Sequence, residues 1–357
     1  SSSRSKFSAN PIGPSRRVRC SAISCTVSGS TSSSDSPLTT TSSDRVTLGN
    51  SSLEISPVGV GVWQWGDRYW GYNGKYGKKD LEECYSSLIS NGIDFIDTAE
   101  VYGLGLSEKL LGEFMKSSPT TPTVATKFAP LPWRLTKDSV PKALKNSLQR
   151  LDQPKVGLYF QHWPGFAFNS FSNEQYLDGL AHCVDQGLCD TVGVSNFNAK
   201  RIKSAVNRLQ AQGIPLVANQ IQYSLVYRKP ERNGVLEMCK EMGVTVVAYS
   251  PLAQGVLTNK YKSGGEMPSD GRKLVMRDSL LEEAREVQEV LKEIGEARGK
   301  TAAQVSLNWL VCQGVVPIVG VKSAKQAEES AGAFGWRLDD AEVDALSRAG
   351  NKVKSLM

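Results

Sequence analysis

The segment IDFIDTAEVYGLG (residues 93–105) begins as an apolar run and places a carboxylate, Asp97, at its end. Tyr102 follows five residues later, with Gly103 and Gly105 directly behind it. A bare charge at the end of a buried strand is strongly destabilising unless another group pairs with it. The segment therefore predicts a strand that delivers an acid to a site, and a partner for Asp97 elsewhere in the chain.

Short runs rich in Val and Ile recur along the chain after residue 45, and helical patterns alternate with them. The runs are apolar on both faces, which is typical of parallel strands covered by helices. The predicted strands are 57–62, 93–97, 123–126, 156–160, 190–194, 216–220, 244–249 and 315–320. The predicted helices are 80–91, 107–116, 138–150, 174–187, 198–209, 231–242, 281–298 and 324–333, with additional ones at 301–312 and 339–349.

This alternation predicts one α/β domain, residues 45–357, folded as a (β/α)8 TIM barrel. Residues 46–57 read as an N-terminal β-hairpin that plugs the bottom of the barrel, and Asp80 reads as the N-cap of the first helix. The alternative is a doubly wound nucleotide-binding sheet, which needs G-x-G-x-x-G after its first strand. Neither the Gly59–Gly61 pair nor the Gly103–Gly105 pair is followed by the third glycine.

Residues 1–44 differ in composition from the rest of the chain. Residues 1–34 contain thirteen serines, five basic residues and no acid, which is typical of an organelle transit peptide; a disordered tail of the mature protein is the alternative. The stretch VRCSAISC (18–25) resembles plastid processing sites, so we expect import into the chloroplast stroma rather than the mitochondrion.

Charge and cysteine content argue against several functions. The net charge is +6, and residues 1–44 carry half of it, so the remaining chain shows no nucleic-acid footprint. No apolar run approaches the roughly 20 residues that a membrane span needs. The cysteines after residue 44 are scattered and lack C-x-x-C spacing, which predicts neither a disulfide scaffold nor a metal site.

Polar residues follow the predicted strands at one end of the barrel, where the chemistry of such barrels lies. They are Asp97 with Tyr102 in the next loop, Lys127, His162, Ser195 with Asn196, Gln220, and Tyr249 with Ser250. Each alone has an ordinary structural reading, such as a solvated lysine or a strand-end cap. Their occurrence together on one rim predicts an active site.

The chemistry of these residues suits carbonyl polarisation. We expect Lys127 to leave the neighbouring strand at the same height as Asp97 and to pair with it. A cation beside a phenol lowers the pKa of Tyr102 from about 10, which makes the phenol a useful general acid. His162 can donate a second hydrogen bond to the same substrate oxygen while another group supplies a hydride.

Several motifs occur in order from residue 97 to residue 330. They are DTAEVYG (97–103), TKF (126–128), QHWP (161–164), GVSNF (193–197), NQIQYS (219–224), AYSPLAQGVLTNKY (248–261), KTAAQVSLNWL (300–310) and VGVKSAKQAEES (319–330). With these motifs the chain resembles the aldo-keto reductases from residue 45 to 350, and most of all their plant plastid-targeted members.

The resemblance implies a catalytic tetrad of Asp97, Tyr102, Lys127 and His162, with NADPH as cofactor. It implies that Ser195, Asn196 and Gln220 hold the nicotinamide carboxamide and that Tyr249 stacks on the ring. It places Ser250, Leu252, Gln254 and Gly255 at the pyrophosphate, and Gly320, Lys322, Ser323, Gln326 and Glu329 at the adenosine end. One departure is Ser330, where the family often has Asn, which weakens one adenine contact.

NADPH is expected rather than NADH because Lys322 precedes a predicted helix N-terminus, which suits a 2′-phosphate. The aromatic loop 63–77 suits flat or hydrophobic carbonyl compounds, or its rings simply pack beneath the loop. The basic segment 258–280 either closes over bound cofactor or is a surface loop.

The function expected is reduction of a small-molecule aldehyde or ketone to an alcohol. A non-catalytic nicotinamide-binding subunit, similar to channel-associated β subunits, is the alternative. Those subunits depart at the tetrad histidine and read Ser-Arg, whereas this chain keeps His162 and Asn196. A third hypothesis is an unrelated barrel enzyme that uses Lys127 as a Schiff base.

Overall fold

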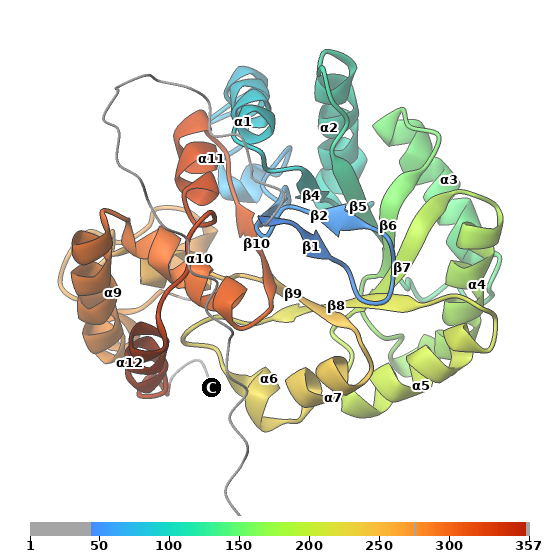
Figure 1. Cartoon of the computed structure of the whole chain (residues 1–357). Helices are drawn as coiled ribbons and strands as arrows, with labels where there is room; N and C mark the ends of the chain where they lie inside the picture. The colour runs from blue at the N-terminus through green and yellow to red at the C-terminus, as the bar shows by residue number, and fades with distance from the viewer. Residues whose placement is uncertain (1–43, 275, 355–357) are drawn as a thin grey trace, which may run out of the picture. The chain divides into compact units, whose positions relative to one another are not determined.

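A computed structural model describes residues 44–274 and 276–354 of the chain. The predicted transit peptide, apart from residue 44 itself, lies outside these residues. The centre is a closed barrel of parallel strands in the order β10-β3-β4-β5-β6-β7-β8-β9 (Figure 1). The strands are β3 (Gly59–Gly61), β4 (Phe95–Asp97), β5 (Thr123–Phe128), β6 (Val156–Gln161), β7 (Cys189–Ser195), β8 (Leu216–Gln222), β9 (Thr245–Tyr249) and β10 (Val316–Gly320).

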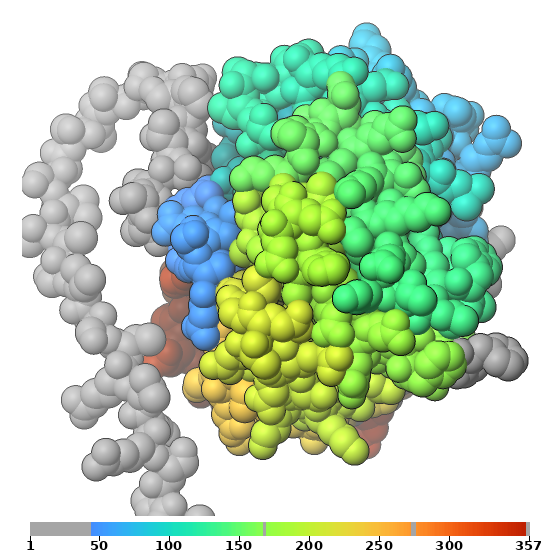
Figure 2. Space-filling model, turned by 90° about the vertical axis from the view of Figure 1, so that its right-hand side faces the viewer, coloured from blue at the N-terminus to red at the C-terminus, as the bar shows by residue number. Residues whose placement is uncertain are grey.

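Helices surround the barrel (Figure 1), and the green and yellow segments form much of the face seen in Figure 2. They are α1 (Lys78–Ser90), α2 (Leu106–Lys116), α3 (Ser139–Leu151), α4 (Asn173–Asp185), α5 (Ala199–Gln210), α6 (Lys229–Arg232), α7 (Val235–Glu241), α8 (Asp278–Glu283), α9 (Arg285–Arg298), α10 (Ala302–Cys312), α11 (Ala324–Ala331) and α12 (Asp340–Gly350). The predicted (β/α)8 barrel is therefore confirmed. No helix in the described part of the chain has both the length and the apolar character to cross a bilayer.

Most helix ends differ from the prediction by up to three residues, and the predicted helix 281–298 is divided into α8 and α9. Two further differences have a clear local cause. The first helix begins at Lys78, and Asp80 is not its N-cap; instead its carboxylate accepts a hydrogen bond of 2.7 Å from the backbone N–H of Gly77. The predicted helix 231–242 is broken into α6 and α7 at Gly234, whose φ of 74° is left-handed and cannot continue a helix.

The N-terminal hairpin closes the amino end of the barrel. Strands β1 (Val46–Thr47) and β2 (Glu54–Ile55) pair antiparallel and lie in front of the barrel strands in Figure 1. Leu48 and Ile55 are fully buried in the cluster that fills the barrel interior. The backbone N–H of Gly49 donates to Oγ1 of Thr245, the first residue of β9, over 2.8 Å. The predicted plug is thus present.

Alternation along the strands decides which side chains enter the barrel. Phe95, Ala125 and Phe160 belong to the interior cluster, whereas Ile96 and Val124 pack outward against the helices. Successive side chains on a strand point to opposite faces, so residues two positions further along continue the interior series. Asp97, Lys127 and His162 are therefore directed into the carboxyl end of the barrel.

Candidate active site

Asp97 finds the partner that its burial requires. Nζ of Lys127 donates to Oδ1 of Asp97 at 2.5 Å, and the side chains of Asp97 and Lys127 are 2% and 0% exposed. The same nitrogen donates to the carbonyl of Thr98 at 2.8 Å and to the phenol oxygen of Tyr102 at 3.2 Å. An ammonium has three donors, and these contacts use all of them. The cation is therefore shared between a carboxylate and a phenol.

The relative height of the two strands differs from the expectation. Asp97 lies opposite Ala125 in the parallel register, so Lys127 lies two residues further along β5. Its long side chain reaches back to the carboxylate, and its nitrogen lies 4.8 Å from the centroid of the Tyr102 ring. The predicted pair is present, although the two residues are not at the same level.

The pKa of Tyr102 corrects a second expectation. Burial raises the pKa of the phenol above its ordinary value, and the Asp97 carboxylate adds to that rise. The Lys127 cation lowers the phenol pKa, as predicted, but it does not outweigh the burial. Burial also opposes the charged form of Lys127, but the Asp97 carboxylate and Tyr102, through their charges and hydrogen bonds, together outweigh it and raise the pKa of the lysine. At neutral pH the phenol thus keeps its proton beside a charged lysine.

His162 completes the group as a neutral ring. Burial, together with the nearby Lys127 cation, holds the pKa of its imidazole well below the ordinary value. Its ring lies edge-on to that of Tyr102, with 5.7 Å between the centroids. Nδ1 is buried and has no hydrogen-bond partner among the described residues. A neutral imidazole donates through one nitrogen only, so it can orient an oxygen without carrying charge.

Gln220 has a contact that the sequence did not indicate. Its Nε2 donates to Oδ2 of Asp97 over 2.8 Å, although 123 residues separate the two. Its backbone carbonyl accepts hydrogen bonds of 2.9 Å from both the Ser195 hydroxyl and the Asn196 backbone N–H. The Tyr249 hydroxyl donates to Oδ1 of Asn196 at 3.0 Å. The four residues expected at the nicotinamide therefore form one network that touches Asp97.

The loop after β9 has an unusual backbone. Ser250, Gln254 and Gly255 have φ angles of 53°, 56° and 107°, and Ala253 between them is also left-handed. Left-handed residues other than Gly are uncommon and concentrate at functional sites. Leu252 packs against the hydrophobic core within this loop. The expected pyrophosphate-binding residues thus share one tight loop at the carboxyl end of β9.

Basic side chains gather where the adenosine end is expected. Burial lowers the pKa of Lys322, and Arg272, Lys75 and Lys260 lower it further, while Asp270 opposes them. The four-cation cluster, Lys75, Lys260, Arg272 and Lys322, sets four cations against the one carboxylate of Asp270, which pairs with Arg272. Nζ of Lys322 lies 4.9 Å from the centroid of the Tyr76 ring. The cluster suits an anion.

The start of α11 lies beside this cluster. The Ser323 hydroxyl caps the helix by accepting from the Gln326 backbone N–H, and Oε1 of Gln326 accepts from the Lys322 backbone N–H at 2.9 Å. Glu329 lies one turn further along α11, and Gly320, which ends β10, is exposed. Ser330 is buried and donates to the Gln326 carbonyl at 2.7 Å. The residue that departs from the family pattern therefore bonds within its own helix.

Segment 258–280 is tied to the loop that follows β3. The Tyr69 hydroxyl donates to the carbonyl of Gly271 at 3.2 Å, and Nζ of Lys75 donates to the Ser269 hydroxyl at 2.7 Å. Since Tyr69 and Lys75 belong to loop 63–77, the segment reaches from β9 across to β3 over the rim. Of the two alternatives, this connection favours closure over a cofactor rather than a surface loop, and the closure itself stays a prediction.

Aromatic rings line the mouth beside Tyr102. Trp63 lies nearly parallel to the Tyr102 ring, with 6.0 Å between centroids and 29° between planes, and its side chain is 48% exposed. Trp65 and Trp70 are buried, so these two rings pack beneath the loop. Other large apolar side chains exposed on the following loops are Leu104, Trp133, Leu135, Phe166 and Phe171.

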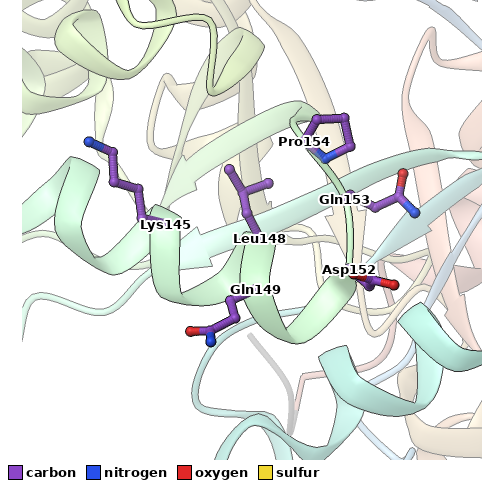
Figure 3. Close-up of a pocket in the computed structure, with 6 residues that line it drawn as sticks. All are labelled: Lys145, Leu148, Gln149, Asp152, Gln153 and Pro154. Atoms are coloured by element: carbon purple, nitrogen blue, oxygen red, sulfur yellow. The ribbon is translucent and has the colours of Figure 1, made fainter.

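A surface depression elsewhere carries no comparable chemistry. It has a volume of about 440 Å³ and lies where the end of α3 turns toward the amino end of β6 (Figure 3). Its lining consists of Lys145, Leu148, Gln149, Asp152, Gln153 and Pro154. Because it lies at the opposite end of the barrel strand from His162, it is separate from the tetrad.

Comparisons with known proteins agree with this geometry. The model of the Aldo/keto reductase family matches residues 57–351. The chloroplastic pyridoxal reductase of Arabidopsis thaliana is 37% identical over 308 residues, which cover 83% of this chain and 84% of that protein. The aldo-keto reductase yakc [NADP(+)] of Schizosaccharomyces pombe is 32% identical over 305 residues, covering 78% and 86%. The structure of a glycerol dehydrogenase from Gluconobacter oxydans matches with a TM-score of 0.74 and 25% identity, over 88% and 97% of the two chains.

Proposed function

The chain belongs to the aldo/keto reductase family, and from this premise we propose that it is an NADPH-dependent reductase of small-molecule carbonyls. One observation carries the proposal: Nζ of Lys127 touches both Asp97 and Tyr102 beside a neutral His162. Such a group can deliver one proton from the Tyr102 phenol to an oxygen, because the Lys127 cation stabilises the phenolate that remains. This is the requirement for turning a carbonyl into an alcohol.

The proposed mechanism assigns a role to each tetrad residue. A carbonyl oxygen is held between the Tyr102 phenol and the His162 imidazole. NADPH, when bound, supplies the hydride to the carbonyl carbon. Tyr102 gives its proton to the oxygen as negative charge develops there, and Lys127 stabilises the resulting phenolate. Asp97 holds Lys127 in place and keeps it charged.

The residues present fit NADPH. Ser195, Asn196 and Gln220 offer hydroxyl and amide groups in one network, and Tyr249 places a ring beside them. The four-cation cluster would hold the 2′-phosphate, because a phosphate accepts charge-assisted hydrogen bonds from Lys and Arg. Ser250, Leu252, Gln254 and Gly255 would line the pyrophosphate. The NADP(+) in the name of the fission-yeast relative supports the same cofactor.

The proposed substrate is a flat aromatic aldehyde, with pyridoxal as the first candidate. Trp63 presents a half-exposed ring inclined by 29° to that of Tyr102, so a planar substrate would stack on Trp63 with its carbonyl at the phenol. The Arabidopsis relative at 37% identity is named as a pyridoxal reductase.

That relative is also named as chloroplastic, and we propose residues 1–44 as a transit peptide to the chloroplast stroma.

The test is a panel of carbonyl compounds assayed with NADPH by loss of the reduced-cofactor absorbance. Pyridoxal should be reduced with a higher kcat/KM than straight-chain aldehydes of similar size. Equal kcat/KM values for both would remove the aromatic preference but keep the reductase. No reduction of any carbonyl, despite tight NADPH binding, would favour the non-catalytic nicotinamide-binding subunit. A borohydride-trapped adduct on Lys127 would instead favour the Schiff-base enzyme.

A further inference from the structure

Asp97 has two partners of different kinds. Oδ1 accepts from the Lys127 ammonium and Oδ2 from the Gln220 amide, so each carboxylate oxygen has its own donor. All three residues are almost fully buried, with exposures of 1%, 0% and 3% for Asp97, Lys127 and Gln220. An unmet oxygen of a buried carboxylate is costly. Gln220 therefore supplies the hydrogen bond that the second oxygen of a charged Asp97 requires.

The carboxylate also decides how the Gln220 amide is turned. An ionised carboxylate only accepts hydrogen bonds, so it can be met by Nε2 and not by Oε1. This fixes Oε1 of Gln220 as the atom left for another ligand. An amide oxygen accepts, so it would select the N–H group of a bound carboxamide rather than its oxygen.

The backbone of Gln220 extends the connection. Its carbonyl accepts from the Ser195 hydroxyl and from the Asn196 backbone N–H, each at 2.9 Å. Asn196 has a left-handed φ of 61°, which the bond from its N–H helps to hold. One residue of β8 thus contacts the acid of the proton-donor group with its side chain and the expected carboxamide ligands with its backbone.

From this geometry we infer that Gln220 is a positioning residue. It couples the residues expected to bind the nicotinamide, Ser195 and Asn196, to Lys127 and Tyr102 through Asp97. The inference rests on the proposed function, and it adds a role to the carboxamide contact expected of this residue. Loss of the amide donor leaves Oδ2 of Asp97 without a hydrogen bond. The carboxylate then attracts the Lys127 ammonium more strongly, and the lysine stabilises the Tyr102 phenolate less. Loss of Asp97 charge, in turn, frees the amide to rotate.

The test separates the two roles by their readouts. Gln220→Met keeps the length of the side chain and removes both amide heteroatoms. We expect kcat at saturating NADPH to fall about tenfold or more, in line with the loss of a charge-assisted hydrogen bond, and the dissociation constant of NADPH to rise. In an Asp97→Asn background the same substitution should lower kcat by only about threefold or less, because the charged acceptor is absent.

Ser195→Ala provides the matched control. It removes another expected carboxamide ligand that contacts Gln220 but not Asp97. Its effect on kcat should differ between the wild-type and Asp97→Asn backgrounds by less than the effect of Gln220→Met does, because Ser195 reaches Asp97 only through the backbone of Gln220. Equal effects of Gln220→Met in the two backgrounds would overturn the inference, because Gln220 would then act through the cofactor alone.

A measurement without activity keeps the inference separate from the proposed function. Urea unfolding of the wild type, Gln220→Met, Asp97→Asn and the double variant should show coupling, with the double variant more stable than the sum of the single losses predicts. If no carbonyl is reduced, the proposed function is wrong, but the four unfolding measurements still test whether Gln220 and Asp97 interact. If Gln220→Met does not fold, the side-chain amide protons of Gln220 in the wild type decide it: slow exchange supports the bond to Asp97, and fast exchange contradicts it.

Discussion

Adjacent residues of β5 contribute to two buried networks, each built on an ion pair, with different consequences. Lys127 points into the barrel and pairs with Asp97, whereas Thr126 points outward and donates to Oε1 of Glu108 at 2.6 Å. Oε2 of Glu108 accepts from Nε of Arg150 at 2.6 Å, and the Glu108 side chain is 0% exposed. Both carboxylates are buried and both have a cation. Burial and pairing alone therefore do not separate the carboxylate proposed to act in catalysis from the other.

The difference lies in what else the cation contacts. Lys127 also donates to the Tyr102 phenol at the open end of the barrel. Arg150 instead donates to the Ser147 hydroxyl at 3.0 Å and packs its side chain against Gly105. A shared cation can change the protonation of a third group, whereas a cation bound only by a hydroxyl and an acid holds the fold together.

Removal of the inner cation should have the largest effect. Lys127→Met strands Asp97 and removes the charge that stabilises the Tyr102 phenolate, so kcat should fall about 10²–10⁴-fold. The variant should also lose about 3–5 kcal/mol of stability, the usual cost of breaking a buried pair. Melting temperature and kcat of Lys127→Met, Asp97→Asn and the double variant provide the measurement.

The double variant tests the pairing itself. Asp97→Asn with Lys127→Met should regain much of the stability, because no charge is left unpaired, and it should stay inactive. Gln220 can still donate to the amide oxygen that the substitution places at position 97. Stability losses that simply add would show that Asp97 and Lys127 are not paired.

Removal of the outer cation is the matched contrast. Arg150→Met leaves Glu108 buried with only the Thr126 hydroxyl, so the chain should lose about 3 kcal/mol of stability or more. Its kcat at a temperature where the chain is folded should change by less than about threefold, because Arg150 has no hydrogen bond to a tetrad residue. A large fall in kcat with unchanged stability would erase the distinction between the two pairs.

The four-cation cluster should show a smaller, cofactor-specific effect. Lys322→Glu replaces a charge-assisted contact to the 2′-phosphate with repulsion, and such contacts contribute about 1.5–3 kcal/mol. The dissociation constant should therefore rise roughly 10- to 150-fold for NADPH, and little for NADH, which lacks that phosphate. Equal weakening of both cofactors would place Lys322 away from it.

The smallest expected effect is on the pH dependence. Because the pKa of His162 lies well below its ordinary value, the ring stays neutral as pH falls through about 6.5. The kcat/KM for reduction should therefore show no loss centred near the ordinary imidazole pKa of about 6.5. A loss there that disappears in His162→Gln would show that the folded imidazole takes up a proton at its ordinary pKa.

The sequence predicts the strand exits well because parallel strands in a barrel end on one rim. It does not by itself separate Lys127 from Thr126, or Gln220 from Asn219, until alternation along each strand is applied. Asn219 points outward and donates to the Phe197 backbone carbonyl at 3.2 Å, so its polarity is structural. The same rule directs Gln220 inward, but nothing local indicates that it meets Asp97 from across the barrel.

Net pKa directions are the part that the sequence could not supply. The identity of the neighbours predicts the sign of each contribution, and Lys127 does lower the pKa of Tyr102. Burial depends on packing of the whole rim, including rings such as Trp63 and Trp163, and its effect on the phenol is larger. The residue types therefore predict which neighbours contribute to each pKa, and the fold decides the direction of the net shift.

The central claim is that Tyr102 donates the proton in carbonyl reduction, while Lys127 and Asp97 stabilise the phenolate that forms. The direct measurement is kcat for reduction of a panel carbonyl by Tyr102→Phe, beside the dissociation constant of NADPH. Phe keeps the ring against Trp63 and removes only the hydroxyl, so we expect kcat to fall about 10²–10⁴-fold with nearly unchanged NADPH binding. A variant that keeps more than about a tenth of the wild-type kcat would contradict the account, because Tyr102 would then not be the general acid.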